Sequence, residues 1–313
     1  MLVVVVVIAW EAAWRSRGFR PSVSNDMELW AIERQRAVAG GGDGVVIVGS
    51  SRVKAGLGPK ALAEATGWQT PIQLAINFSS PVLALEDLAA DPRFHGLVIV
   101  DVAPIILFNA FWPLENMVGG YFAYRDHARW SESFNTWLTS LVESSFVFRL
   151  PELSGSHLFE TLIKGELPAE QRFHDDRFRV TRIASSTHPA APPANGGDGG
   201  AVGMERQGLD ALIARVNAAL ERLRSHDARA VFVSMPTAGA MAETENRIFP
   251  REKYWDVFAK GVEAPALNCR DEAELARFVP PDGSHLTSEQ AVEFSRALGR
   301  VLAGKLAIPS ASR

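Results

Sequence analysis

The chain has 313 residues, of which 47% are hydrophobic and 22% are charged, as expected for a globular protein with a large core. Its formal net charge is −4, so it lacks the basic excess of a nucleic-acid-binding protein. The single cysteine, Cys269, excludes an internal disulfide and any metal site built from several cysteines, but leaves the redox compartment open.

The N-terminal segment 1–14 is apolar. Residues 2–10 read LVVVVVIAW, which is shorter than the roughly 20 apolar residues that span a bilayer. Arginines follow this run at 15, 17 and 20 rather than precede it, which is not the order of a signal peptide. A buried strand, a short interfacial segment and a membrane anchor shortened by a late start codon all fit. We favour the shortened anchor, because no turn signal precedes the run.

Segment 15–43 is a polar connector. It contains a helical pattern near 26–38 and ends at Gly40–Gly42, so we expect a lead-in helix before the main domain.

Segment 44–306 alternates short apolar runs with helical patterns. The apolar runs predict strands buried on both faces of a parallel sheet. They are Val45–Val48, Ile72–Ile76, Leu97–Val102 and Ala230–Ser234, with a weaker fifth near Ala266–Asn268. Helical patterns occupy 57–66 and 209–223, and another begins near Thr287, which has capping-box spacing to Gln290. The alternation predicts a doubly wound α/β domain with a mostly parallel five-stranded sheet and flanking helices.

A helical insertion, 105–203, separates the third and fourth predicted strands. Its first part, 105–180, is rich in aromatic residues, which favours either an extension of the core or a cap over a substrate. Residues 189–203 are rich in Pro and Gly and predict a flexible loop. Residues 307–313 form a C-terminal tail.

Gly49-Ser50-Ser51-Arg52 ends the first predicted strand, directly before a helix. Binding sites of open α/β sheets form at this edge, and backbone N–H groups at a helix start can stabilise a developing oxyanion. A serine nucleophile also needs a base, so this motif alone is equally a polar turn.

Asp282 and His285 lie three positions apart, just before the last predicted helix. At this spacing the carboxylate can fix the imidazole tautomer while the other ring nitrogen faces a hydroxyl. The alternative is a solvated histidine in a loop that leads into a helix.

The serine loop and the late Asp-x-x-His together resemble the SGNH/GDSL hydrolases. The resemblance implies a flavodoxin-like strand order. It aligns Ser51 as nucleophile, His285 as base and Asp282 as the acid that orients it, and Ser50 stands where the family usually has aspartate.

The middle blocks of this superfamily, which supply a glycine amide and an asparagine to the oxyanion hole, are not matched cleanly. LAINFSSP at 74–81 follows the second strand, and VIVDVAPIILFN at 98–109 lacks the usual Gly-x-Asn-Asp. Asn77 is the candidate donor, with a turn-capping role as its alternative. The Ser51 amide and a neighbouring backbone amide are the other candidates.

A narrower resemblance is to the membrane-anchored SGNH-like proteins of bacterial envelope-polysaccharide acylation, of the alginate O-acetylation and teichoic-acid D-alanyl-transfer type. It rests on Gly-Ser-Ser-Arg, LAIN, the late DGSHL, the lead-in 11–34, SMPTAG at 234–239 and IFPREKYWD at 248–256. It implies a membrane-anchored, extracytoplasmic domain that works with a membrane-bound O-acyltransferase. The alternative localisation is cytoplasmic.

Ser50 and Arg52 are further candidates for oxyanion or substrate contacts, although Arg52 is equally suited to pair with a neighbouring acid. No phosphate-binding loop or metal-ligand spacing occurs, so we expect no cofactor and no metal. The sequence therefore predicts a serine-dependent acyl-ester hydrolase or O-acyltransferase that acts on a cell-envelope polysaccharide. The alternatives are a catalytically weak accessory module that binds polysaccharide or docks on an acyltransferase, and an unanchored cytoplasmic esterase.

Overall fold

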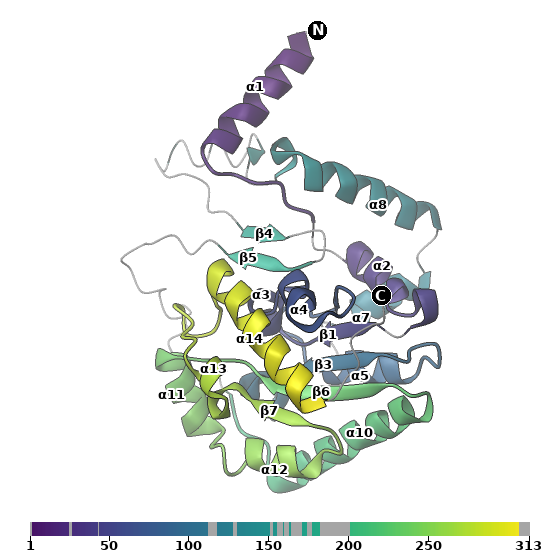
Figure 1. Ribbon diagram of the computed structural model, residues 1–313, viewed down its shortest axis with the longest axis vertical. Coiled ribbons are helices and arrows are strands. Elements are labelled where there is room, and N and C mark those ends of the chain that lie inside the picture. The colour runs from purple at the N-terminus through teal and green to yellow at the C-terminus, as the bar shows by residue number, and fades with distance from the viewer. Residues whose placement is uncertain are drawn as a thin grey trace.

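A sheet of five parallel strands forms the centre of the molecule (Figure 1). The strands are β1 (Val45–Val48), β2 (Ile72–Gln73), β3 (Leu97–Asp101), β6 (Arg229–Ser234) and β7 (Ala266–Asn268), in the spatial order β2-β1-β3-β6-β7. Every residue of β1 and β3 is buried, as their continuous apolar sequences require. The predicted doubly wound α/β class is confirmed, with all five strands parallel.

The computed structural model describes most of the chain. The described residues are 2–24, 27–42, 44–111, 118–127, 130–150, 153–154, 159, 163, 171–173, 177–181 and 201–306. Most of the predicted flexible loop, 189–200, and the predicted tail 307–313 lie outside the described residues.

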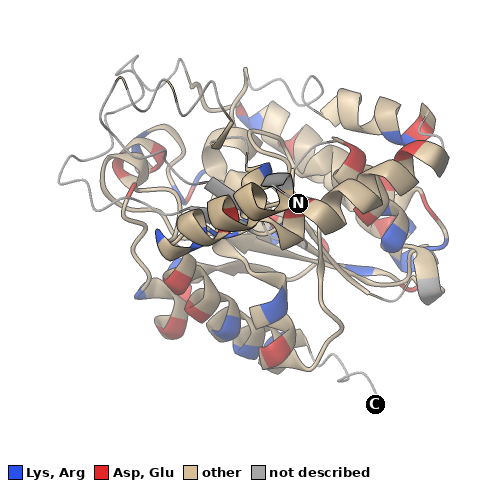
Figure 2. Cartoon of the chain, turned by 90° about the horizontal axis from the view of Figure 1, so that it is seen from above, with Lys and Arg blue, Asp and Glu red and all other residues tan. Residues whose placement is uncertain are grey.

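Helices cover both faces of the sheet, and alternate residues of each strand point to opposite layers. Val45 and Ile47 pack with α3 (Ser51–Gly56), α4 (Pro59–Thr66), α13 (Ala273–Ala276) and α14 (Ser288–Leu306). Val46 and Val48 pack with α2 (Met27–Arg36), α5 (Val82–Ala89), α10 (Arg206–Ser225) and α12 (Trp255–Gly261). Acidic and basic residues are interspersed along the helices (Figure 2).

Further elements accompany these two helical layers. They are η1 (Ala39–Gly41), α6 (Pro104–Leu107), α7 (Val118–His127), α8 (Trp130–Ser145), η2 (Val147–Arg149), the antiparallel pair β4 (Gln171–Phe173) and β5 (Arg179–Thr181), α11 (Gly239–Ile248) and η4 (Cys269–Asp271).

Most element boundaries lie close to the predicted ones, with two differences. β2 is shorter than predicted, although its backbone continues to pair with β1 through Ile76 N to Gly49 O at 2.9 Å. The helix predicted at 57–66 starts at Pro59, with the separate helix α3 before it. The predicted capping box is present, because Thr287 N donates to Gln290 Oε1 and Gln290 N donates to Thr287 Oγ1.

The apolar N-terminal run is helical. Residues Leu2–Ser16 form α1, so the strand alternative is wrong. Within the described residues, no helix combines the length and the apolar composition needed to cross a membrane.

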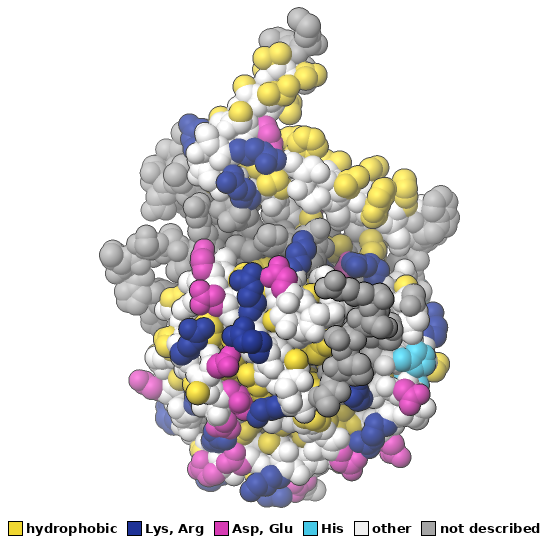
Figure 3. Space-filling view, in the orientation of Figure 1, with side chains coloured by type: hydrophobic (Ala, Val, Ile, Leu, Met, Phe, Trp, Pro, Cys, Tyr) yellow, Lys and Arg dark blue, Asp and Glu magenta, His cyan; other side chains and the backbone are white. Residues whose placement is uncertain are grey.

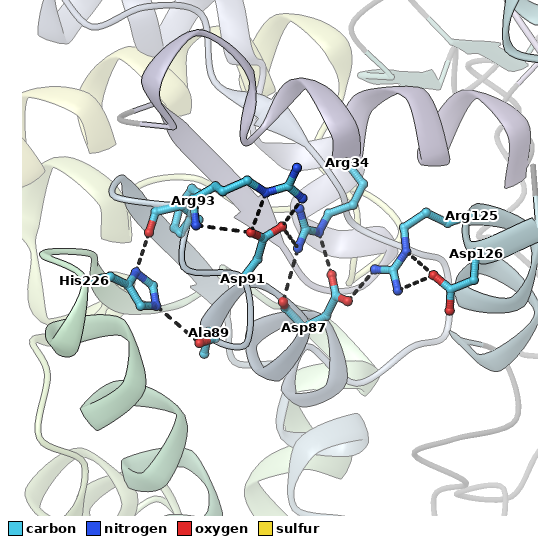
Figure 4. Close-up of polar contacts among 9 residues, drawn as sticks. Arg34, Asp87, Ala89, Asp91, Arg93, Arg125, Asp126 and His226 are labelled. Atoms are coloured by element: carbon cyan, nitrogen blue, oxygen red, sulfur yellow. Dashed lines mark hydrogen bonds and ion pairs between the residues drawn. The ribbon is translucent and has the colours of Figure 1, made fainter. Parts of the chain in front are cut away.

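The lead-in helix α2 and the insertion helix α7 are both held to α5 by buried and half-buried ion pairs (Figure 4). Arg34 of α2 donates to Asp87 at 2.5 Å and lies 3.5 Å from Asp91. Arg125 of α7 pairs with the other carboxylate oxygen of Asp87. These contacts fix two segments that lie outside the repeating strand–helix pattern.

The aromatic residues of the insertion divide into two groups. Tyr121 and Phe122 of α7 pack against the buried Trp30, so α7 extends the core, which was one of the two predicted roles. The large apolar residues of α8 are exposed instead.

Candidate active site

The loop after β1 reaches the start of α3 through a close backbone approach. A Cβ atom at Gly49 would lie 2.3 Å from Asp101 Cβ and 2.7 Å from Val53 Cγ1, so only glycine fits there. Ser50 then caps α3, and its Oγ accepts a hydrogen bond from Arg52 N. Ser51 is therefore the first residue of a helix at the carboxyl edge of the sheet, where β1 and β3 are neighbours and the strand order changes direction.

Ser51, His285 and Asp282 lie in hydrogen-bond contact with one another. His285 Nε2 is 3.0 Å from Ser51 Oγ, a contact between residues 234 positions apart. His285 Nδ1 is 2.9 Å from Asp282 Oδ2. The three side chains predicted to form a triad are thus brought together in the predicted order.

Asp282 is held ionised by its surroundings. Burial by itself would raise the pKa of Asp282, but hydrogen bonds from the His285 ring and from the backbone N–H groups of His285 and Ser284 lower it to about 2. An ionised carboxylate at Oδ2 accepts a hydrogen bond from Nδ1–H of His285, which turns Nε2 toward the Ser51 hydroxyl. Serine, neutral imidazole and carboxylate in this arrangement can perform acyl transfer.

Ser50 is hydrogen-bonded to the buried Asp101. Its Oγ donates to Asp101 Oδ2 at 2.7 Å, and its N–H donates to the same oxygen at 3.1 Å. Burial raises the pKa of Asp101, and the hydrogen bonds from Ser50 lower it. The structure thus places Ser50 behind Ser51, facing the end of β3. Sequence reasoning missed Asp101, although a carboxylate that ends the apolar run LVIVD is a visible signal.

Arg52 is also engaged inside the protein. Its Nε donates to Ser284 Oγ at 3.0 Å, and its Nη2 lies 2.7 Å from Glu245 Oε1 of α11 in a buried ion pair. The prediction that Arg52 would pair with a neighbouring acid therefore describes the structure better than a direct substrate contact. Glu245 was not singled out in the sequence, because it lies in an ordinary helical pattern.

The loop that carries Asp282 and His285 is fixed on a second side. Ala238 N donates to Gly283 O at 3.0 Å. Gly283 has a φ of 82°, and a Cβ there would lie 2.8 Å from Ala238 O. Glycine is required at this position, so the DGSH turn is anchored by the segment after β6 as well as by Arg52.

Asn77 directly follows Ile76, the last residue of the β2 segment whose backbone contacts the loop after β1. Ile76 N donates to Gly49 O at 2.9 Å, which places Asn77 beside the loop that carries Ser51. The Oδ1 atom of Asn77 is buried and has no hydrogen-bond partner among the described residues, so this atom caps no turn. Phe78 follows with a φ of 55° and an exposed ring.

No known protein family is matched by the chain, and no curated protein sequence matches it significantly.

Proposed function

We propose that the protein is a serine-dependent acyl-ester hydrolase or O-acyltransferase. The observation that carries this proposal is the contact chain from Ser51 Oγ through His285 to an ionised Asp282. Structural ion pairs also bring acids and histidines together, but a half-buried serine hydroxyl against the second ring nitrogen of such a pair, at the switch point of an α/β sheet, is an arrangement suited to nucleophilic catalysis.

The reaction follows from these positions. Ser51 Oγ attacks the acyl carbonyl carbon while its proton passes to His285 Nε2. The tetrahedral intermediate collapses, the bond to the leaving oxygen breaks, and His285 returns the proton to that oxygen. A water or a sugar hydroxyl then attacks the acyl–Ser51 ester and gives its proton to His285 Nε2. The bond between the acyl carbon and Ser51 Oγ breaks, and His285 returns the proton to Ser51 Oγ. Hydrolysis and transfer differ only in this second acceptor.

Some backbone N–H groups near Ser51 already donate hydrogen bonds inside the protein and are therefore not available to an oxyanion. The N–H of Ser50 donates to Asp101 and the N–H of Arg52 donates to Ser50 Oγ. The Ser51 N–H precedes the first helical bond of α3, which is Lys54 N to Ser50 O, so it belongs to the unpaired donors of a helix start. We therefore assign the oxyanion to the Ser51 amide, with the Asn77 side-chain amide as second donor.

The substrate and partner rest on the sequence resemblance. The nucleophile after the first strand and the acid–histidine turn before the last helix support membership of the SGNH/GDSL superfamily. The narrower resemblance supports a cell-envelope polysaccharide as substrate and a membrane-bound O-acyltransferase as partner, with the domain extracytoplasmic.

Labelling with a fluorophosphonate, followed by peptide mapping, tests the proposal. We expect the label on Ser51 and none after Ser51→Ala. Ser50→Ala is the matched control, since it removes the adjacent hydroxyl but leaves the contact between Ser51 and His285. A folded protein that takes up no label, or that is labelled elsewhere, contradicts the assignment.

An accessory module that binds polysaccharide or docks on an acyltransferase is the second candidate. It is favoured by the engagement of Ser50 and Arg52 in structural contacts, which leaves few groups for the oxyanion. This candidate requires Ser51→Ala to preserve polysaccharide acylation in cells that carry the partner enzyme, whereas the catalytic proposal requires its loss.

A further inference from the structure

Helix α8 has an inverted distribution of polar and apolar residues. Phe134, Trp137, Leu138 and Leu141 recur at helical spacing and are 45–55% exposed. We call these four residues the α8 apolar face. On the opposite side Glu143 is buried, and its carboxylate accepts hydrogen bonds from the N–H and hydroxyl of Ser24 at 2.7 and 2.9 Å. A surface helix normally turns its apolar stripe to the core, so α8 is oriented toward an apolar environment outside the protein.

Helix α1 exposes apolar side chains all around its axis. Residues 4–8, which are consecutive valines and one isoleucine, are 37–62% exposed, and Trp10 is exposed as well. Consecutive positions on a helix point in different directions, so no single flat partner could cover them all. A helix that is apolar on all sides is normally surrounded by protein or by lipid.

Hydrogen bonds fix the base of α1 against the end of α8. The carboxylate of Glu11 accepts hydrogen bonds from the N–H groups of Val147 and Phe148 in η2, at 2.9 and 3.0 Å. Arg15 Nη2 donates to Ser145 O at 2.8 Å. Phe19 packs with Val147 in a small separate core. The relative position of α1 and α8 is therefore set by specific hydrogen bonds.

The two apolar surfaces occupy the same end of the molecule. In Figure 1, α1 projects from this end and α8 lies across it. Figure 3 shows hydrophobic side chains gathered along both helices. In Figure 2, viewed from that end, the N-terminus lies over the middle of the molecule. If a plane is drawn across this end, α1 crosses it at a steep angle and α8 lies along it.

Cationic and aromatic residues gather where such a plane would pass. Arg17, Arg20 and Arg149 are exposed near the base of α1, and the Arg17 guanidinium lies 5.5 Å from the Trp14 ring centroid. Exposed Phe146 and Phe148, at the start of η2 and within it, contact each other with ring centroids 5.4 Å apart. Arginines that meet lipid phosphates and aromatic rings at the headgroup level are typical of membrane interfaces.

We propose that the α8 apolar face binds the surface of a lipid bilayer, with α1 inserted beside it, and that this second contact fixes the orientation of the α/β domain on the membrane. This goes beyond the N-terminal anchor predicted from the sequence and does not depend on the serine chemistry. The occupant is lipid because α1 is exposed on all sides, because α8 continues the same apolar end, and because arginines line the junction. At about 22 Å, the 15 residues of α1 reach well into a leaflet.

An environment-sensitive fluorophore on a cysteine at position 138 tests the contact in the full chain. The native Cys269 is buried, and burial raises its pKa to about 12, so it does not compete for the label. We expect the emission of NBD-labelled Leu138→Cys to shift to the blue on addition of phosphatidylcholine–phosphatidylglycerol vesicles and to be quenched by brominated lipid. Labelled Glu221→Cys, on the exposed side of α10, is the matched control and should not respond.

Vesicle flotation supplies an independent measurement. Replacement of the α8 apolar face by four serines should weaken binding at least ~10-fold, since several partly exposed apolar side chains lose their lipid contact. Val202→Ser with Val279→Ser removes exposed apolar residues elsewhere and should leave binding unchanged. Co-flotation without any change of the label at 138 would show that α1 alone binds lipid and overturns the proposal. A blue shift that grows with protein concentration in the absence of vesicles would identify a second copy as the occupant and also overturns it.

Discussion

Arg52 and Ser284 join the two ends of the candidate active site, since Arg52 Nε donates to Ser284 Oγ at 3.0 Å across 232 positions of sequence. Arg52 directly follows the candidate nucleophile, and Ser284 lies between Asp282 and His285. Nη2 of the same guanidinium contacts Glu245. The distance between Ser51 and His285 thus depends on a buried cation that we place outside the chemistry itself.

Arg52→Met should therefore destabilise the protein by about 3–5 kcal/mol, because it leaves the Glu245 carboxylate buried without its cation. The measurement is denaturant unfolding. The double variant Arg52→Met/Glu245→Met should recover much of this loss, since no buried charge then remains. Equal losses in the single and double variants would show that packing, and not charge pairing, accounts for the effect.

Adjacent serines should respond differently to the same change. Ser51→Ala should reduce turnover of a chromogenic acetyl ester at least ~10³-fold while the free energy of unfolding stays nearly unchanged. Ser50→Ala should retain the fluorophosphonate label but lose about 1–3 kcal/mol of stability, because the buried Asp101 carboxyl loses a hydroxyl donor. If Ser50→Ala abolishes labelling in a protein that remains folded, the roles of the two hydroxyls have been assigned wrongly.

The loss of activity at low pH should follow the binding of a single proton to the enzyme. Since the Asp282 pKa is held at about 2, Asp282 stays ionised until the pH falls close to that value, and its own protonation should not contribute to a loss of activity at higher pH. A rate profile with a slope of one is expected on the acid side. A slope of two would mean that a second group, such as Asp282, titrates with it.

Asp282 should also make stability depend on pH. Its pKa is lowered in the folded state, so its contribution is present above the unfolded value of 3.8 and is lost as pH falls toward about 2. Asp282→Asn should weaken this dependence between pH 4 and pH 2, measured by thermal unfolding. The effect is limited by solvent screening, because the carboxylate is only half-buried. An unchanged dependence would place the acid-sensitive groups elsewhere.

Some of this architecture could be predicted from the sequence because its signals are local. Buried parallel strands have continuous apolar sequences. Thr287 and Gln290 form the capping box that their spacing predicts. The contact between Ser51 and His285 could be predicted only through a family pattern, and their catalytic role stays a prediction. Asp101 is marked only by its place at the end of the apolar run LVIVD, and Glu245 has no local signature, because burial and ion pairing arise only when distant elements pack. Likewise, periodicity identifies the apolar stripe of α8, but tertiary packing decides which way it points.

The variant Asp101→Asn tests whether the Asp101 side chain, which lies behind Ser51, is protonated in the folded protein. Burial raises the pKa of Asp101 above its ordinary value of 3.8, and the hydrogen bonds from Ser50 both go to Oδ2, while Oδ1 has no partner among the described residues. A neutral acid with its proton on Oδ1 fits these contacts.

A buried, protonated Asp101 makes the stability of the wild-type protein fall as pH rises. As pH rises above 3.8, the unfolded chain ionises Asp101 while the folded chain resists, so the wild-type protein loses stability through that window until the folded pKa is passed. Asparagine cannot ionise. The free energy of unfolding of Asp101→Asn should therefore increase relative to that of wild type as pH rises from about 3.8. Only the trend with pH is diagnostic, because the new amide N–H groups add a constant cost at every pH. A relative stability that falls with rising pH would show that Asp101 is bound as a carboxylate, with Arg52 as its counter-charge.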